Sequence, residues 1–80
     1  NMYNVSLADM NQGECFVVKR VIDQVELLSH LDDVGIELDT LLKVKEKDDF
    51  NGLMTITIEK ENKTISLITA KKIFGNKKII

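Results

Sequence analysis

The sequence predicts a mainly β domain, in which a five-stranded sheet curls into a small barrel with one helix between the first two strands. Three observations indicate this architecture. From residue 40 onward, apolar and polar residues alternate with a period of two, as in strands with one exposed face. The pair Asn51 and Gly52 is a strong hairpin signal between two such strands. Helical spacing of apolar residues occurs once, between Asp23 and Gly35.

The first strand is expected from Glu14 to Ile22, a short segment rich in Val, Ile and Phe. The helix should follow directly, with Asp23 as its N-cap and Glu26 completing a capping box. Gly35 supplies the positive φ that ends a helix of about ten residues. Its buried face is expected to consist of Val25, Leu28 and Leu31, widened by Leu27 and Val34.

The remaining strands are expected as a meander. One strand begins near Thr40 and ends at the turn 48–52, and the next covers residues 54–59. A tight turn at residues 60–63 should lead into a third strand from Thr64 to Ile68. After a short turn capped by Thr69, Ile73 and Phe74 close the sheet, and residues 75–80 are ambiguous.

Size and charge restrict the function of residues 1–80, which correspond to a single domain. Its thin core leaves little room for a pocket of roughly 300–1,000 Å³, so we expect a functional surface. The 11 basic and 13 acidic residues give a net charge of −2, which argues against a nucleic-acid partner. Residues 21–42 carry six acids and no Lys or Arg, whereas residues 60–80 carry six lysines and one acid. These stretches are either two oppositely charged sides or ordinary solvated surface.

The single cysteine excludes an internal disulfide, and no signal peptide or apolar run of about 18 residues is visible. A cytoplasmic location is therefore expected. Asn1 before Met2 is typical of an expression remnant or of the cut edge of a longer chain.

Chemistry at a catalytic or metal site is not expected. A nucleophile and base could come only from Cys15 and His30, but Cys15 opens an apolar strand and His30 lies on the outer flank of the helix. His30, Asp32 and Asp33 include metal-ligand types, yet residues so close in a helix point in different directions. The four glycines are isolated, so no phosphate loop is present. We therefore expect no enzyme activity, metal or cofactor.

Phe50 and Asn51, at the tip of the predicted hairpin, are the first candidates for a partner-binding surface. An aromatic side chain beside a turn either anchors a partner or folds back over the barrel mouth. Asp32 and Asp33 are further candidates, because acids at a helix C-terminus oppose the helix dipole and so cost some stability.

Four groups of residues form one ordered pattern along the chain: Ser6-Leu7-Ala8-Asp9 with Gly13-Glu14; Leu28, Leu31, Val34, Gly35 and Ile36; Thr40, Leu42 and Val44; and Ile65-Ser66-Leu67, Ala70 and Ile73. In this order and spacing they resemble the FeoA family, small accessory proteins of bacterial ferrous-iron uptake. The chain departs from the family at Leu38-Asp39, where Pro-Gly is frequent, and near Asn62, where Gly is frequent.

The resemblance implies an SH3-like barrel that contacts a FeoB-type membrane transporter on its cytoplasmic side. The same fold forms the C-terminal domain of metal-dependent repressors related to diphtheria toxin repressor, whose ligand residues have no secure counterpart here. Two functions are thus expected: an accessory protein that binds and regulates the transporter, or the regulatory domain of an iron- or manganese-dependent repressor.

Overall fold

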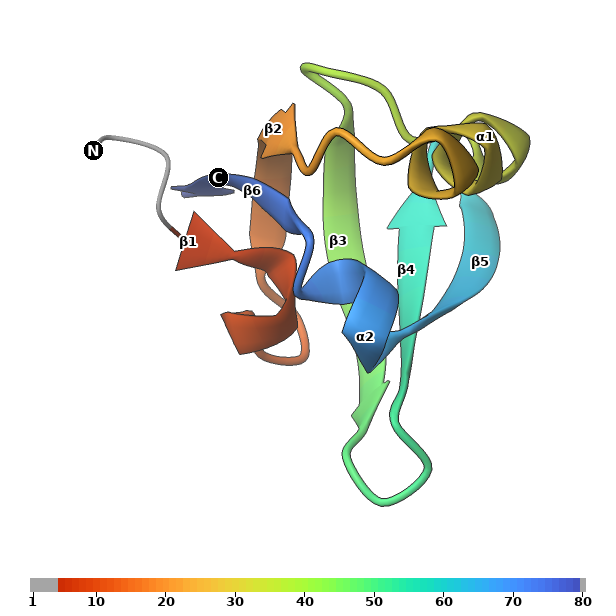
Figure 1. The fold of residues 1–80 in the computed structure, drawn as a ribbon. Coiled ribbons are helices and arrows are strands. Elements are labelled where there is room, and N and C mark those ends of the chain that lie inside the picture. Colours follow the sequence, from red (N-terminus) through yellow and green to blue (C-terminus); the bar gives the residue numbers. More distant parts are fainter. Residues whose placement is uncertain (1–4, 80) are drawn as a thin grey trace.

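The computed structural model describes residues 5–79 as a six-stranded antiparallel sheet with three short helical segments (Figure 1). In chain order the elements are β1 (Val5–Ser6), η1 (Leu7–Asp9), β2 (Cys15–Val21), α1 (Val25–Val34), β3 (Leu41–Asp48), β4 (Leu53–Ile58), β5 (Glu61–Ser66), α2 (Leu67–Ala70) and β6 (Ile73–Lys78). The strand order is β1-β6-β2-β3-β4-β5. The five predicted strands correspond to β2–β6, with the predicted helix between the first two of them, so the mainly β fold class is confirmed.

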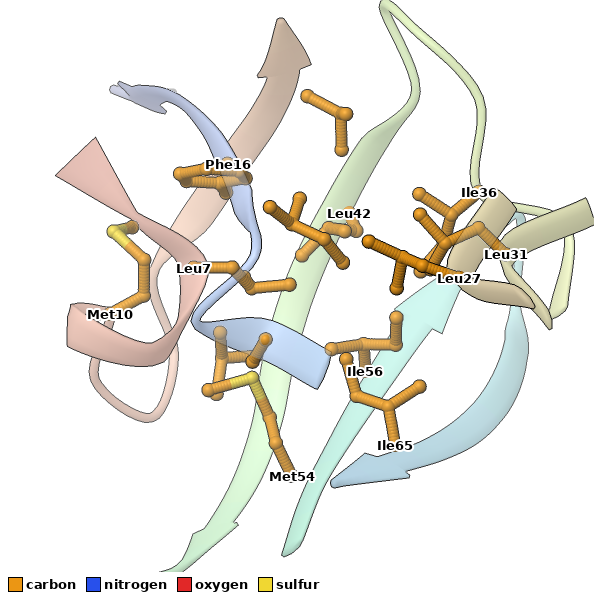
Figure 2. Packing of buried hydrophobic residues seen from close by; sticks show 14 residues of the cluster. Leu7, Met10, Phe16, Leu27, Leu31, Ile36, Leu42, Met54, Ile56 and Ile65 are labelled. Carbon is orange, nitrogen blue, oxygen red and sulfur yellow. The ribbon is translucent and has the colours of Figure 1, made fainter. Parts of the chain in front are cut away.

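The core is formed by the inward side chains of β2–β6, closed at one end by α1. Among the described residues no buried side chain is polar or charged. Within residues 5–79 the core contains 14 hydrophobic residues (Figure 2): Leu7, Met10, Phe16, Val18, Leu27, Leu31, Ile36, Leu42, Val44, Met54, Ile56, Ile65, Ala70 and Ile73. Alternate residues of β3 and β4 supply this core, as the period-two pattern predicts.

The predicted cap and buried face of α1 are both wrong in part. The helix begins at Val25 after an extended Gln24, whose side chain makes no cap hydrogen bond. Gln24 rather than the predicted Asp23 therefore holds the N-cap position, and Glu26 is the second helical residue instead of the third, where a capping box requires it. Its end at Gly35 is as predicted, with a φ of 93°. None of the described helices has the length and hydropathy needed to span a membrane.

Leu27 and Leu31 are the buried residues of α1, whereas Val25 is 83% and Leu28 40% exposed. Leu27 and Leu31 lie together with Ile36 at the α1 end of the core (Figure 2). The expected face around Val25 and Leu28 has equivalent helical spacing, but it is turned away from the sheet. Packing against the sheet therefore selects the face.

The turn between β4 and β5 contains Glu59 and Lys60, not the predicted residues 60–63. Ile58 pairs with Glu61, and the two intervening residues have φ values of 48° and 72°. This is the backbone twist of a two-residue hairpin, which favours Asn-Gly and is unusual for Glu and Lys. Asn62 and the residues after it therefore belong to β5.

β5 ends earlier than predicted, because Ser66 rather than Thr69 caps a helical turn. The Thr69 N–H donates to Ser66 Oγ at 3.0 Å, and Leu67 begins α2. This turn buries Ala70 against the core and directs the chain back toward β6.

Gly75 permits the close approach of β6 to β2. Of the ambiguous segment 75–80, residues 75–78 belong to β6, and residue 80 lies outside the described residues. Gly75 pairs with Val5 on one side and Val18 on the other. A Cβ atom at Gly75 would lie 1.9 Å from the carbonyl oxygen of Val17. That distance is impossible for real atoms, and the obstacle is backbone, so the strands could accept a side chain only by moving apart.

Glu14 joins the loop before β2 to the end of β6. Its carboxylate accepts a hydrogen bond from the Asn11 N–H at 2.7 Å and lies 2.5 Å from Lys77 Nζ. The hydrogen bond from Lys77, and then that from Asn11, lowers the pKa of Glu14 below its ordinary value of 4.5.

We expect Gly75→Ala to lower the free energy of unfolding by about 3 kcal/mol, the upper end of the usual cost of overpacking. Chemical denaturation followed by circular dichroism measures this change. The control is Lys78→Ala on the exposed end of β6, which should change stability by less than about 0.5 kcal/mol. Equal stability of Gly75→Ala and the parent protein would contradict the close approach.

We expect stability to decrease on acidification below about pH 4.5, partly through Glu14. A carboxyl group whose pKa folding lowers stabilises the fold above its unfolded-state pKa, and this contribution is lost as pH falls through its folded-state pKa. Glu14→Gln should therefore lower Tm at neutral pH and flatten its acid dependence, and Lys77→Ala should do the same. Thermal unfolding across this range is the measurement, and an unchanged acid branch in Glu14→Gln would refute the assignment.

Candidate functional site

Phe50 projects from the tip of the β3–β4 hairpin and is 96% exposed. This placement excludes the alternative in which the ring covers the core. Asn51 shapes the tip: its backbone N–H donates to Asp48 Oδ1 at 2.9 Å and its side-chain amide to Asp48 Oδ2 at 2.8 Å. These bonds, the backbone one first, lower the pKa of Asp48 below its ordinary value of 3.8. The hairpin tip therefore presents an aromatic ring on an ordered turn.

Asp32 and Asp33 are exposed at the C-terminal end of α1. That end lies near the start of β3, whereas the β3–β4 hairpin lies at the opposite end of the sheet (Figure 1). The four predicted partner-binding residues therefore belong to two separate regions, with Phe50 and Asn51 at one end and the two aspartates at the other.

Asp33 borders a groove between the end of α1 and the β4–β5 hairpin, with a volume of about 760 Å³. We call it the α1–hairpin groove and define it by its lining residues: Asp33, Val34, Gly35, Glu37, Asp39, Thr40, Leu41, Ile58, Glu59, Glu61 and Lys63. Five of these residues are acidic, one is basic and three are large and aliphatic.

One wall of the α1–hairpin groove is the loop after α1, which is fastened to β2. The Asp39 N–H donates to the carbonyl of Val18 at 2.7 Å, and the Val18 N–H donates to the carbonyl of Thr40 at 3.0 Å. Lys19 Nζ contacts Asp39 Oδ1 at 2.6 Å. The Glu37 N–H donates to Thr40 Oγ1 at 2.9 Å. These bonds fix the backbone that carries the acidic side chains.

The other wall is the β4–β5 hairpin, where Glu59 and Glu61 flank Lys60 at the turn. Lys63 Nζ lies 3.5 Å from Glu61 Oε2, which makes an ion pair, and Thr57 Oγ1 donates to Asn62 Oδ1 at 2.8 Å. The sequence did not predict this wall, because its pattern predicts a turn at residues 60–63 and places Glu59 in the preceding strand. The pattern Glu-Lys-Glu at a hairpin was the available signal.

The α1–hairpin groove is electrically negative. Two of its carboxylates have lysine partners, Asp39 with Lys19 and Glu61 with Lys63. The other three, Asp33, Glu37 and Glu59, form no ion pair with any residue in the range 5–79. The groove therefore combines aliphatic surface with uncompensated negative charge.

Lysines collect on the outer face of the sheet. Register places Lys78, Cys15, Lys43, Thr57 and Asn62 in one row across β6, β2, β3, β4 and β5. A shallow hollow of about 600 Å³ next to this row is lined by Lys43 and by two further lysines, Lys45 and Lys60. This face therefore offers positive charge.

Cys15 and His30 do not form a pair. Cys15 is partly exposed at the start of β2, and His30 is exposed on α1 beside Gln24 and Lys72. β2 runs for seven residues, roughly 20 Å, before the chain reaches α1. Within residues 5–79 no three His, Cys, Asp or Glu side chains are grouped so that they could hold a metal ion.

Solved structures with the same fold include two regulators. The manganese regulator SloR aligns with a TM-score of 0.85 and 26% identity, covering 95% of this chain and 35% of that chain. A manganese-dependent transcriptional repressor in complex with manganese aligns with a TM-score of 0.86 and 23% identity, covering 91% of this chain and 36% of that chain. The chain thus spans about a third of each regulator, and the SH3-like fold is confirmed.

The crystal structure of an iron uptake regulatory protein, FeoA, aligns with a TM-score of 0.82 and 19% identity, covering 91% of this chain and 95% of that chain. No curated protein matches at significant similarity. The FeoA domain matches residues 5–77, which include every described helix and strand except Lys78, the last residue of β6. Because the FeoA domain matches most of its length, this chain belongs to the FeoA family.

Proposed function

We propose that this protein is a cytoplasmic accessory protein of ferrous-iron uptake that binds and regulates a FeoB-type membrane transporter without catalysing a reaction. The observation that carries this proposal is the FeoA-domain match over residues 5–77. The aligned structure of FeoA, an iron uptake regulatory protein, supports it through the shared fold.

The architecture supports a binding role for physical reasons. Apolar side chains from the strands and the helical segments fill the core. An internal reaction site would replace some of these side chains, and a small domain depends on their burial for its stability. Recognition must then use exposed groups, and such a domain can act by docking against a larger protein.

Phe50 is the proposed anchor for that docking. Complete burial of a phenylalanine ring contributes about 1.5–3 kcal/mol, and aromatic residues are frequent hot spots of interfaces. The Asp48–Asn51 hydrogen bonds hold the turn beneath the ring, so little order is lost on binding. We propose Asn51 as a neighbouring contact, and Asp32 and Asp33 as contacts at the opposite end.

We expect the purified domain to co-purify with a FeoB-type transporter in detergent, and Phe50→Ala to weaken this association about tenfold or more. The variant should change the free energy of unfolding by less than about 1 kcal/mol, because the ring is exposed. Ile68→Ala, which truncates an exposed apolar residue of α2, is the matched control and should bind normally. No association of the parent domain, together with unchanged iron uptake after gene deletion, would overturn the proposal.

A second candidate function is the C-terminal regulatory domain of an iron- or manganese-dependent transcriptional repressor. The observation favouring it is the alignment with SloR, which covers nearly all of this chain but about a third of that regulator. The reading frame upstream of Met2 distinguishes the two functions. A winged-helix region there, with metal-dependent DNA binding by the full-length protein, would decide for the repressor.

A further inference from the structure

We propose that the α1–hairpin groove binds an extended, positively charged peptide segment of a partner protein. The aliphatic side chains of the segment would lie on the groove floor, and its Lys or Arg side chains would face the acidic walls. This inference goes beyond the proposed function, since it concerns a surface distant from Phe50 and holds for either candidate function.

The floor of the α1–hairpin groove is an extension of the core. Val34 and Ile58 are partly buried and pack against the core, and Leu41 beside them is 48% exposed. An aliphatic side chain placed here would contact apolar atoms that already exclude water on their inner side. Burial of such area is the non-directional part of the binding free energy.

The charges select the occupant. Asp33 lies at the end of α1, Glu37 in the following loop and Glu59 at the β4–β5 turn, so the unpaired carboxylates stand along both walls. Carboxylates distributed in this way complement several cations spaced along a chain rather than a single ion. An acidic peptide would meet repulsion at the same positions, so charge complementarity favours a basic one.

The walls are already in place before a ligand arrives. The loop from Glu37 to Thr40 is bonded to β2 through Val18 and Lys19, and the hairpin wall is part of a continuous β4–β5 ladder. A preformed groove loses little conformational entropy on binding, so a few modest contacts suffice for measurable affinity.

Both walls of the groove contain a charged residue with a positive φ, a conformation that favours glycine. Among the described residues, positive φ occurs outside glycine at Asp39, Glu59 and Lys60, two of which line the groove. The β3–β4 hairpin of the same chain uses Asn51 and Gly52, which suit turns better. At the groove, charged residues occupy turn positions that glycine or asparagine would occupy with less strain.

The experiment is a titration of the ¹⁵N-labelled domain with short capped peptides, followed by NMR chemical shifts at low and high salt. The probe alternates lysine and valine, and two matched peptides replace lysine by glutamate or valine by glycine. We expect a Kd of about 10⁻⁴ M at low salt for the Lys-Val peptide, with shifts at Gly35, Thr40, Leu41 and Lys63. The Glu-Val peptide should not bind, and the Lys-Gly peptide should bind more weakly.

Variants locate the charge dependence. The double variant Glu37→Gln with Glu59→Gln should weaken binding of the Lys-Val peptide about tenfold. The matched control removes the same amount of charge outside the groove, with Glu46→Gln and Asp49→Asn. It should change the Kd of the Lys-Val peptide by less than about twofold, because salt screens charges that lie far from the bound peptide. Equal weakening by both pairs, shifts confined to another face, or equal binding of the Glu-Val peptide would overturn the proposal. Because no transporter is used, this outcome is independent of the proposed function.

Discussion

The close approach of β6 to β2 at Gly75 is the constraint on which the rest of the structure depends. The Val17 carbonyl occupies the space where a side chain at residue 75 would begin, so β6 can insert between β1 and β2 only with glycine there. That insertion lets β6 contribute Ile73 to the core and brings Lys77 to Glu14. With β6 in place, the inner faces of β2–β6 share one wholly apolar core, and every charged group of the described chain lies outside it.

The α1–hairpin groove follows from the way the chain returns from α1 to the sheet. α1 covers the end of the core with Leu27 and Leu31, and the chain must then reach the start of β3. It does so through a loop bonded to β2 at Val18, which leaves the end of the helix standing opposite the β4–β5 turn. The space between them stays open, and Leu41 beside it is 48% exposed.

Local chemistry made the strands, the helix end and one hairpin predictable. The alternation along β3 and β4 indicates the strands, Gly35 ends the helix, and the Asn51-Gly52 pair forms the hairpin turn. Each of these signals depends only on residues close to one another in the sequence. The face of α1 was not predictable, since Leu27 and Leu28 belong to equally good helical stripes and only the sheet distinguishes them. Gly75 and the groove are likewise products of distant segments: the glycine is explained by Val17, and the groove carboxylates come from α1, from the loop after it and from the β4–β5 hairpin. The exposed position of Phe50 was predicted as one of two alternatives.

Neither the Phe50 contact nor the α1–hairpin groove alone supplies enough binding free energy for a stable complex. A micromolar complex requires about −8 kcal/mol, after the cost of association has been met. Burial of the Phe50 ring contributes about 1.5–3 kcal/mol, and each exposed ion pair at the α1–hairpin groove contributes less than about 1 kcal/mol. The two regions lie at opposite ends of β3, on a scaffold that the core keeps rigid. Under the proposed function, a partner that contacts both Phe50 and the α1–hairpin groove binds more tightly than either contact alone permits. A partner that loses one of the two contacts dissociates readily, as reversible regulation requires.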